Sequence, residues 1–265
     1  DAQDRWMLTT PVSYPADGTA MTTLRKSAAN IRLGEYIADA TAESIARYGL
    51  DTPRLVIRLH QAAGTIGAVG TTGSYATTDY PESTITLVIG EQESDLVDYV
   101  LYNGGIYRCS TLLLRGVMNA DWQETITRYP VLTALGNLAS LSRETADGVD
   151  TWVITRTEQV AENNELVTDD EGNQVYDIAL TKNGEPSDYT AFSAAYNQLM
   201  MVTMSGRLPD GWTAADAPHT VWTFTDVDGT VHTVALTRYD AMHDAVAIDG
   251  VALFYLIQGG FSLGI

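Results

Sequence analysis

This sequence is short of cysteine. Cys109 is the only one in 265 residues. An internal disulfide, a zinc site built from thiolates and a Cys-x-x-Cys redox pair are therefore all excluded. We interpret Cys109, two residues after Tyr107, as a half-buried core side chain rather than as a nucleophile.

Basic residues are also scarce. Fifteen Lys and Arg stand against 34 Asp and Glu, which gives a formal net charge of −19. A field of this sign repels phosphate backbones and anionic lipid headgroups, so we exclude nucleic acid as a partner. Solubility is a simpler explanation of the excess acid than a dedicated acidic functional surface.

Long apolar runs are absent. None reaches the roughly 18 residues that a membrane-spanning helix needs, so the sequence predicts that this stretch does not cross a membrane. The first residue is Asp1 rather than Met. We therefore expect the natural chain to begin earlier, with a leader or an anchor ahead of this stretch.

The sequence offers no complete catalytic or metal-binding motif. Its four histidines form no His-Glu-x-x-His pattern, and the nearest approach to a metal site is Asp240, His243 and Asp244. We interpret this trio as loop polar residues. Gly260–Gly264 matches the Gly-x-Ser-x-Gly nucleophile elbow, but only one residue follows it, so no supporting helix can form. We therefore predict a protein that is not an enzyme, with no cofactor and no bound metal.

What the sequence does contain is an internal repeat. Pro15–Ala20 (PADGTA) reappears as Pro186–Ala191 (PSDYTA), and in both copies an aspartate occupies the N-cap position of a following helix. Apolar residues then recur at helical spacing, namely Met21, Leu24, Ala28 and Ile31 in the first copy and Phe192, Ala195, Leu199 and Val202 in the second. A repeat of this kind indicates two similar folding units.

Strand candidates and turn signals surround these two helices. Asn103-Gly104 joins two strands in the first module, and Asp228-Gly229 and Asp249-Gly250 do so in the second. We predict an α+β fold with two tandem repeats, each an antiparallel sheet with one main amphipathic helix packed on it. The expected division is module one at residues 1–118, a connecting segment at 119–148 and module two at 149–265.

Module one contains an insertion that module two lacks, at about residues 61–83. It is rich in Gly and Thr and has no Lys or Arg. We expect a surface hairpin or a disordered loop rather than a binding loop, because small side chains provide little contact energy. Most aromatic residues fall on strands, whereas Tyr80 and Trp212 fall on expected loops, so these two mark a possible binding surface.

Several motifs, taken in order, resemble a known family. A Trp-x-Leu at Trp6 is followed by the Pro-Ala-Asp of the first repeat, by Tyr-Gly-Leu-Asp-x-Pro at Tyr48–Pro53, by Ile89-Gly90 at a strand end and by a Tyr-Val…Ile-Tyr hairpin. This order is similar to that of the domain-of-unknown-function 4340 (DUF4340) family. The likeness covers most of residues 5–118 and, more loosely, 175–257. The resemblance implies a bacterial protein that is anchored by one N-terminal membrane helix and encoded beside components of an ABC-type transport system.

Two functions follow as hypotheses. The first is a non-enzymatic, extracytoplasmic, membrane-anchored module that contacts protein partners at the membrane, among them transporter subunits. The second is an extracytoplasmic protein that binds a sugar or a peptide through exposed aromatics and the 61–83 stretch. A pocket lined by Tyr or Trp favours the second hypothesis, and a flat apolar patch favours the first.

Overall fold

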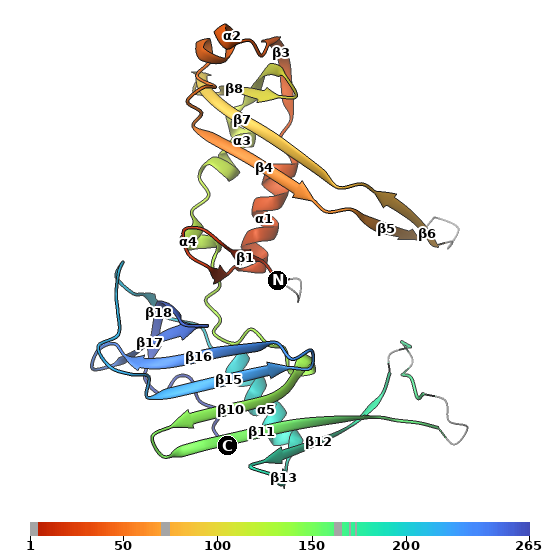
Figure 1. Cartoon of the computed structure of the whole chain (residues 1–265), viewed down its shortest axis with the longest axis vertical. Helices are drawn as coiled ribbons and strands as arrows, with labels where there is room; N and C mark the ends of the chain where they lie inside the picture. The colour runs from red at the N-terminus through yellow and green to blue at the C-terminus, as the bar shows by residue number, and fades with distance from the viewer. Residues whose placement is uncertain (1–4, 70–74, 162–165, 170, 173) are drawn as a thin grey trace. The chain divides into compact units, whose positions relative to one another are not determined.

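The computed structural model describes residues 5–69, 75–161, 166–169, 171–172 and 174–265. The chain forms two compact units: residues 18–125, and residues 126–265 together with the first 17 (Figure 1). Both units contain helices and antiparallel strands, so the predicted α+β class is confirmed.

The unit of residues 18–125 is a five-stranded sheet with helices beside it. Its elements are α1 (Gly18–Ala29), β3 (Leu33–Asp39), α2 (Ala42–Arg47), β4 (Leu55–Gln61), β5 (Gly64–Val69), β6 (Tyr75–Tyr80), β7 (Ser83–Ser94), β8 (Val97–Tyr102), β9 (Gly105–Ser110), α3 (Thr111–Met118) and α4 (Trp122–Thr125). The sheet order is β3-β9-β8-β7-β4. Asn103 and Gly104 join β8 to β9 with positive φ values of 47° and 77°, the backbone geometry that a two-residue hairpin prefers.

The core of this unit lies between the sheet and α3. Ile57, Ile89 and Val100 of the strands form one buried cluster with Leu114 of α3. Cys109 of β9 belongs to the same cluster, and burial raises the pKa of its thiol to about 11. The cysteine therefore has the core position that its sequence context predicted.

The inserted stretch extends the β4–β7 hairpin. Strands β4 and β7 pair with Gln61 opposite Ser83, and β5 and β6 pair in the same register with Gly64 opposite Tyr80. Pro81 falls in the gap between the two ladders, because proline has no amide hydrogen to donate. The described part of the insertion is thus an extended hairpin (Figure 1), and residues 70–74 lie outside the described residues.

The other unit contains a nine-stranded antiparallel sheet. Its elements are β1 (Met7–Leu8), β2 (Tyr14–Pro15), η1 (Leu135–Asn137), β10 (Leu138–Thr145), β11 (Gly148–Glu158), β12 (Tyr176–Lys182), β13 (Glu185–Ser187), α5 (Tyr189–Met200), β14 (Gly206–Arg207), β15 (Thr220–Asp226), β16 (Val231–Arg238), β17 (His243–Ile248) and β18 (Val251–Ile257). The sheet order is β13-β12-β11-β10-β15-β16-β17-β18-β14, and β1 and β2 form a separate pair.

Helix α5 begins where the repeat predicted it. The Asp188 carboxylate accepts hydrogen bonds from the backbone N–H groups of Thr190 and Ala191, at 2.8 and 3.2 Å. This confirms the predicted cap and satisfies two of the helix's free donors. Phe192 and Leu199 of the predicted apolar face are both buried.

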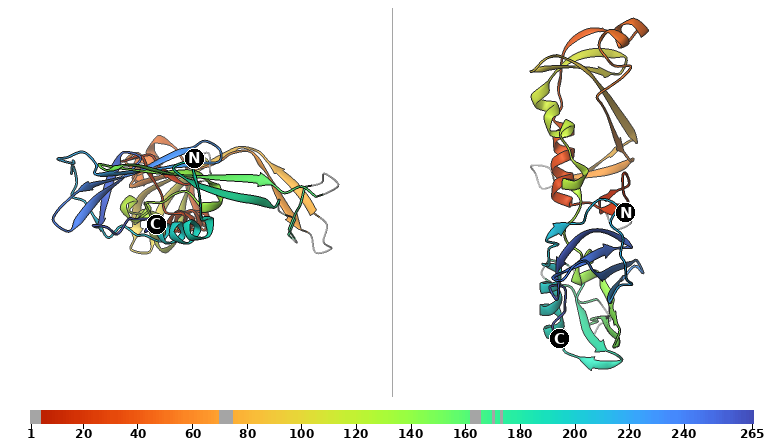
Figure 2. Two further views of the ribbon diagram at one scale, coloured as in Figure 1. Left: turned by 90° about the horizontal axis from the view of Figure 1, so that it is seen from below. Right: turned by 90° about the vertical axis from the view of Figure 1, so that its left-hand side faces the viewer.

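Helix α5 lies against one face of the nine-stranded sheet (Figure 2), and aromatic side chains fill the space between them. Phe192 contacts Trp152 of β11, and Tyr196 contacts Phe224 of β15, with ring centroids 6.3 Å apart in each pair. Trp152 also stacks on Trp222 at 6.5 Å. All five side chains are almost completely buried, so this layer is the core of the larger unit.

The structure does not confirm a tandem repeat. Helix α1 packs on α3, and Ala28 is the buried residue of its face, whereas α5 packs on the sheet through large aromatics. The sheets also differ, with five strands in one unit and nine in the other. The shared motif marks a similar helix start in each unit, since α1 begins directly after Asp17 as α5 does after Asp188.

The stretch at 119–148, which we expected to connect two modules, contains α4, η1 and β10. Strand β10 lies in the interior of the nine-stranded sheet, between β11 and β15. None of the helices within the described ranges is both long enough and apolar enough to cross a membrane.

The two helices give a matched test of these cores. Phe192→Ala removes a fully buried ring and should lower the free energy of unfolding by about 3–5 kcal/mol. Met21→Ala truncates a half-buried side chain of α1 and should cost about 1 kcal/mol. Urea unfolding followed by circular dichroism measures both. An equal loss of unfolding free energy in the two variants would contradict this, because it would mean that Met21 contributes as much to its core as Phe192 does.

The insertion should be dispensable for folding. Replacing Ala62–Glu82 by Asn-Gly keeps Gln61 opposite Ser83 and closes β4 and β7 with a favourable hairpin turn. Loop-closure entropy changes slowly with length, so we expect the free energy of unfolding to change by about 1–2 kcal/mol at most. Thermal unfolding of the shortened chain measures this, and loss of the folded state would make the hairpin a structural element.

Candidate binding surface

Trp212, one of the two residues marked by the sequence, belongs to a cluster of aromatic side chains. Its ring meets that of Tyr239 edge-on, with centroids 6.0 Å apart, and Tyr239 stacks on Tyr255 at 5.2 Å. His243 meets the other ring of this pair, Tyr255, at 4.9 Å. All four side chains are half-buried. We call Trp212, Tyr239, His243 and Tyr255 the aromatic cluster.

Small residues in the sheet position this cluster. Tyr255 of β18 is opposite Gly206 of β14 on one side and Ala245 of β17 on the other. A Cβ atom at Gly206 would lie 2.3 Å from the Tyr255 hydroxyl, so the ring lies directly over the glycine. Only a residue without a side chain allows this close approach.

A carboxylate holds the histidine of the cluster. Asp240 accepts from the backbone N–H of Met242 at 2.7 Å and of His243 at 2.8 Å, and its carboxylate also lies 2.9 Å from His243 Nδ1. The bond from Met242, together with those from His243, lowers the pKa of Asp240. The cluster therefore combines aromatic rings with one fixed negative charge.

The third member of the metal-like trio has other partners. Asp244 is buried, and its Oδ1 lies 3.2 Å from His219 Nε2 and 3.5 Å from Arg238 Nη1, without hydrogen-bond geometry. Among the residues that the structure describes, no group of His, Cys, Asp or Glu could hold a metal ion. In the elbow-like sequence, Phe261 and Leu263 are buried and Ser262 is exposed.

On five strands of the nine-stranded sheet, the side opposite α5 carries almost no charge. We call this side of β10, β11, β15, β16 and β17 the outer face. Its positions follow from the strand registers, since Trp152, Phe224 and their like-facing neighbours point to α5 and the alternate residues point away. These are Ser140, Ser142 and Glu144; Val149, Thr151, Val153, Thr155 and Thr157; Val221, Thr223 and Thr225; Val231, Thr233, Ala235 and Thr237; His243, Ala245 and Ala247.

Within this set of positions Glu144 is the one residue among Asp, Glu, Lys and Arg, and His243 is the one histidine. The side chains are short, and most are half-buried or exposed, so the surface is low in relief. Because Tyr255 is opposite Ala245, the aromatic cluster lies at one end of the outer face. A large uncharged sheet face is unusual for a chain with a net charge of −19.

Tyr80, the second residue marked by the sequence, lies in the other unit, on β6 of the extended hairpin. It is opposite Gly64, and a Cβ atom at that glycine would lie 2.5 Å from the tyrosine hydroxyl. The ring thus covers the glycine of the neighbouring strand, a packing role that accounts for its half-buried state. Tyr80 and Trp212 belong to separate units, so they do not form a shared site within one unit.

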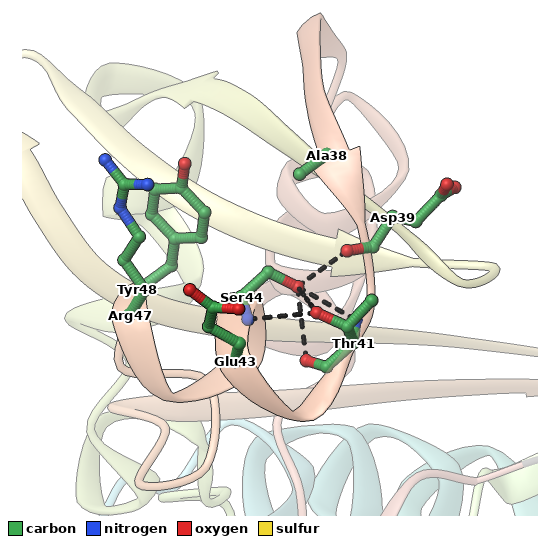
Figure 3. A pocket seen from close by; sticks show the side chains of 7 residues that line it. All are labelled: Ala38, Asp39, Thr41, Glu43, Ser44, Arg47 and Tyr48. Carbon is green, nitrogen blue, oxygen red and sulfur yellow. Dashed lines mark hydrogen bonds between the residues drawn. The ribbon is translucent and has the colours of Figure 1, made fainter.

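A polar hollow of roughly 230 Å³ lies beside α2 (Figure 3). Thr41 and Ser44 form a capping box at the start of that helix, and the Ser44 hydroxyl donates to the backbone oxygen of Asp39 at 2.6 Å. Arg47 and Tyr48 line the other side, with the guanidinium 5.6 Å from the ring centroid. Thr41 and Ser44 serve to start the helix, and the lining residues include no histidine that could activate the serine. Helix α2 was not predicted from the sequence, and Thr41 followed three residues later by Ser44 is the signal that could have indicated its start.

The aromatic cluster makes a coupling prediction. Gly206→Ala should displace the Tyr255 ring and lower the free energy of unfolding by about 1–3 kcal/mol. In a Tyr255→Ala background the same change should be nearly neutral, because the clash is then absent. A double-mutant cycle by urea unfolding measures the coupling. Additive effects of the two substitutions would show that the ring does not lie over Gly206 in solution.

One protein-family model, described as a domain of unknown function (DUF4340), matches residues 6–219. The match therefore includes elements of both units, together with Tyr80 and Trp212, and ends just before β15. No curated protein and no solved structure matches the chain. Since the matched region is most of the 265 residues, the chain belongs to the DUF4340 family.

Proposed function

We propose that this protein is a non-enzymatic, extracytoplasmic module, held at a membrane, that serves a transport or surface complex through protein contacts. The observation that carries the proposal is the outer face of the nine-stranded sheet. It is broad, low in relief and uncharged apart from Glu144. Interface cores are depleted of charged residues in this way.

The chemistry of the outer face indicates the kind of partner. Neighbouring strands place Ser142 opposite Thr151 and Thr223, and Thr223 opposite Thr233, so small side chains meet across the whole width. Such a surface suits a second flat surface of short apolar and hydroxyl side chains. A β-sheet packed about 10 Å away is the arrangement that matches it.

Family membership supports the setting rather than the contact. The resemblance described above implies an N-terminal membrane helix and a gene beside ABC-type transport components. A subunit of such a transporter is therefore the partner we propose, on the extracytoplasmic side of the membrane. The excess of acidic residues is compatible with this setting, because it keeps an exposed module soluble.

A second candidate function is the binding of a sugar or a peptide, and the aromatic cluster is the observation that favours it. Trp212 and Tyr239 are half-buried and partly open to solvent, and Asp240 adds a fixed acceptor for hydroxyl or amide groups. Aromatic rings with a few polar groups are typical of such sites. The extended hairpin at 61–83 is the other element that this function would use.

The two functions separate in a pull-down from native membranes with the tagged protein. Thr223→Arg places a charge in the centre of the outer face, and Thr203→Arg makes the same change at an exposed position after α5. We expect wild type and Thr203→Arg to recover a transporter subunit, identified by mass spectrometry. Thr223→Arg should recover about tenfold less, because an unpaired charge becomes buried on docking.

The result that contradicts the proposal is specific. Equal recovery by Thr223→Arg and wild type would exclude the outer face as the docking surface. Failure to recover any transporter subunit, with saturable binding of an oligosaccharide that Trp212→Ala abolishes, would favour the second function instead.

A further inference from the structure

One edge of the nine-stranded sheet is only partly covered. Strand β13 pairs with β12 through three residue pairs, which take up Leu180–Lys182. Among the residues that the structure describes, no strand lies beside the preceding segment, Tyr176–Ala179 (Figure 1). We call Tyr176–Ala179 the open edge.

Two residues of the open edge direct their backbone groups away from the sheet. Gln159 N donates to Val175 O, and Asn183 N donates to Thr151 O, which fixes the odd-numbered residues of β12 as those bonded to β11. In an antiparallel ladder, alternate residues point to opposite sides. The N–H and C=O groups of Tyr176 and Ile178 therefore point outward, as those of Leu180 and Lys182 do toward β13.

The side chains of the open edge alternate in character. Tyr176 and Ile178 share one face of the strand, and each is 42% exposed. Asp177 lies on the opposite face, is exposed, and accepts a hydrogen bond from Gln159 Nε2 at 2.6 Å. A strand added at this edge would thus meet apolar side chains on one face and a carboxylate on the other.

The stretch of sequence that contains the open edge is acidic, and the cations that flank it are Arg156, opposite Ile178, and Lys182. Residues 157–181 include seven acidic residues and no Lys or Arg. Exposed sheet edges are usually protected by Lys, by Pro or by shortness, and β13 follows this rule with Pro186 and only three residues. The open edge has neither Lys nor Pro, and its Asp177 repels a second copy of itself.

We propose that the open edge binds an extended segment of a partner protein by β-strand addition, and that this segment alternates apolar residues with Lys or Arg. The backbone groups of Tyr176 and Ile178 hold the added strand, whose apolar side chains pack beside theirs. Its basic side chains face Asp177. The proposal goes beyond docking on the outer face, since it concerns the edge of the sheet and can hold whether or not that face binds a partner.

The experiment uses three fluorescent hexapeptides: acetyl-(Lys-Val)3-amide, acetyl-(Glu-Val)3-amide and acetyl-(Lys-Pro)3-amide. The first has the proposed pattern, the second reverses its charge, and the third keeps its charge but cannot supply strand N–H groups at alternate positions. Fluorescence anisotropy at low salt measures affinity. Hydrogen exchange of the wild-type amides of Tyr176 and Ile178 shows whether the peptide pairs with them.

Three variants complete the design. Ile178→Pro removes an outward N–H that the sheet does not use, and should weaken the Lys-Val peptide about tenfold. Asp177→Lys should weaken it about fivefold by reversing the nearest charge. Asp216→Lys, the matched control, makes the same charge change at an exposed loop position and should leave affinity unchanged.

We expect the Lys-Val peptide to bind more tightly than both others and to slow exchange at Tyr176 and Ile178. Equal binding of the Lys-Pro peptide would overturn the proposal, because charge alone would then explain the affinity. Unchanged exchange at the two amides would overturn it as well, and this measurement needs no variant to fold. The proposal would also be overturned if Ile178→Pro bound the Lys-Val peptide with the affinity of the wild type and unfolded at the same midpoint.

Discussion

The burial of aromatic rings between α5 and one face of the nine-stranded sheet is the contact on which the larger unit depends. Trp152, Phe192 and Phe224 each remove a large apolar area from water, and α5 is the one helix of eight or more residues described in that unit. Cations border this layer, since Lys182 Nζ lies 5.0 Å from the Trp152 ring centroid and Arg143 lies 5.7 Å from that of Trp222. Because α5 covers only one side, the opposite side of the same strands has no helix against it among the described residues of this unit. The functional surfaces proposed here are consequences of this one-sided core.

The sequence predicted the parts of the fold that depend on local signals. The cap at Asp188 and the hairpin at Asn103-Gly104 both follow from short-range rules about hydrogen-bond donors and φ angles. Strand β10 was missed because its buried leucines, Leu138 and Leu141, are three residues apart. A bulge between Leu138 and Ser140 brings both to the same face, and a bulge is visible only once the strand has its neighbours.

The repeat and the candidate site show where local reasoning stops. Similar helix starts at Asp17 and Asp188 do not determine what each helix packs against, because packing depends on residues distant in sequence, such as Leu114 for one unit and Trp152 for the other. Trp212 could be singled out as an aromatic residue on a loop. Its partners could not, since Tyr239 and Tyr255 come together only through the pairing of β14, β17 and β18.

The negative charge of the chain is distributed unevenly, both between the two units and within the larger one. Residues 18–125 have a net charge of −4, and the rest of the chain has −15. Within that larger unit the outer face has one acidic residue among its strand positions, while residues 157–181 of the sequence include seven and no Lys or Arg. Solubility alone requires no such segregation, because it depends on the overall charge. A protein that docks on a neutral face and attracts a basic strand to an adjacent edge does require it, since both surfaces depend on carboxylates being absent from one and concentrated at the other.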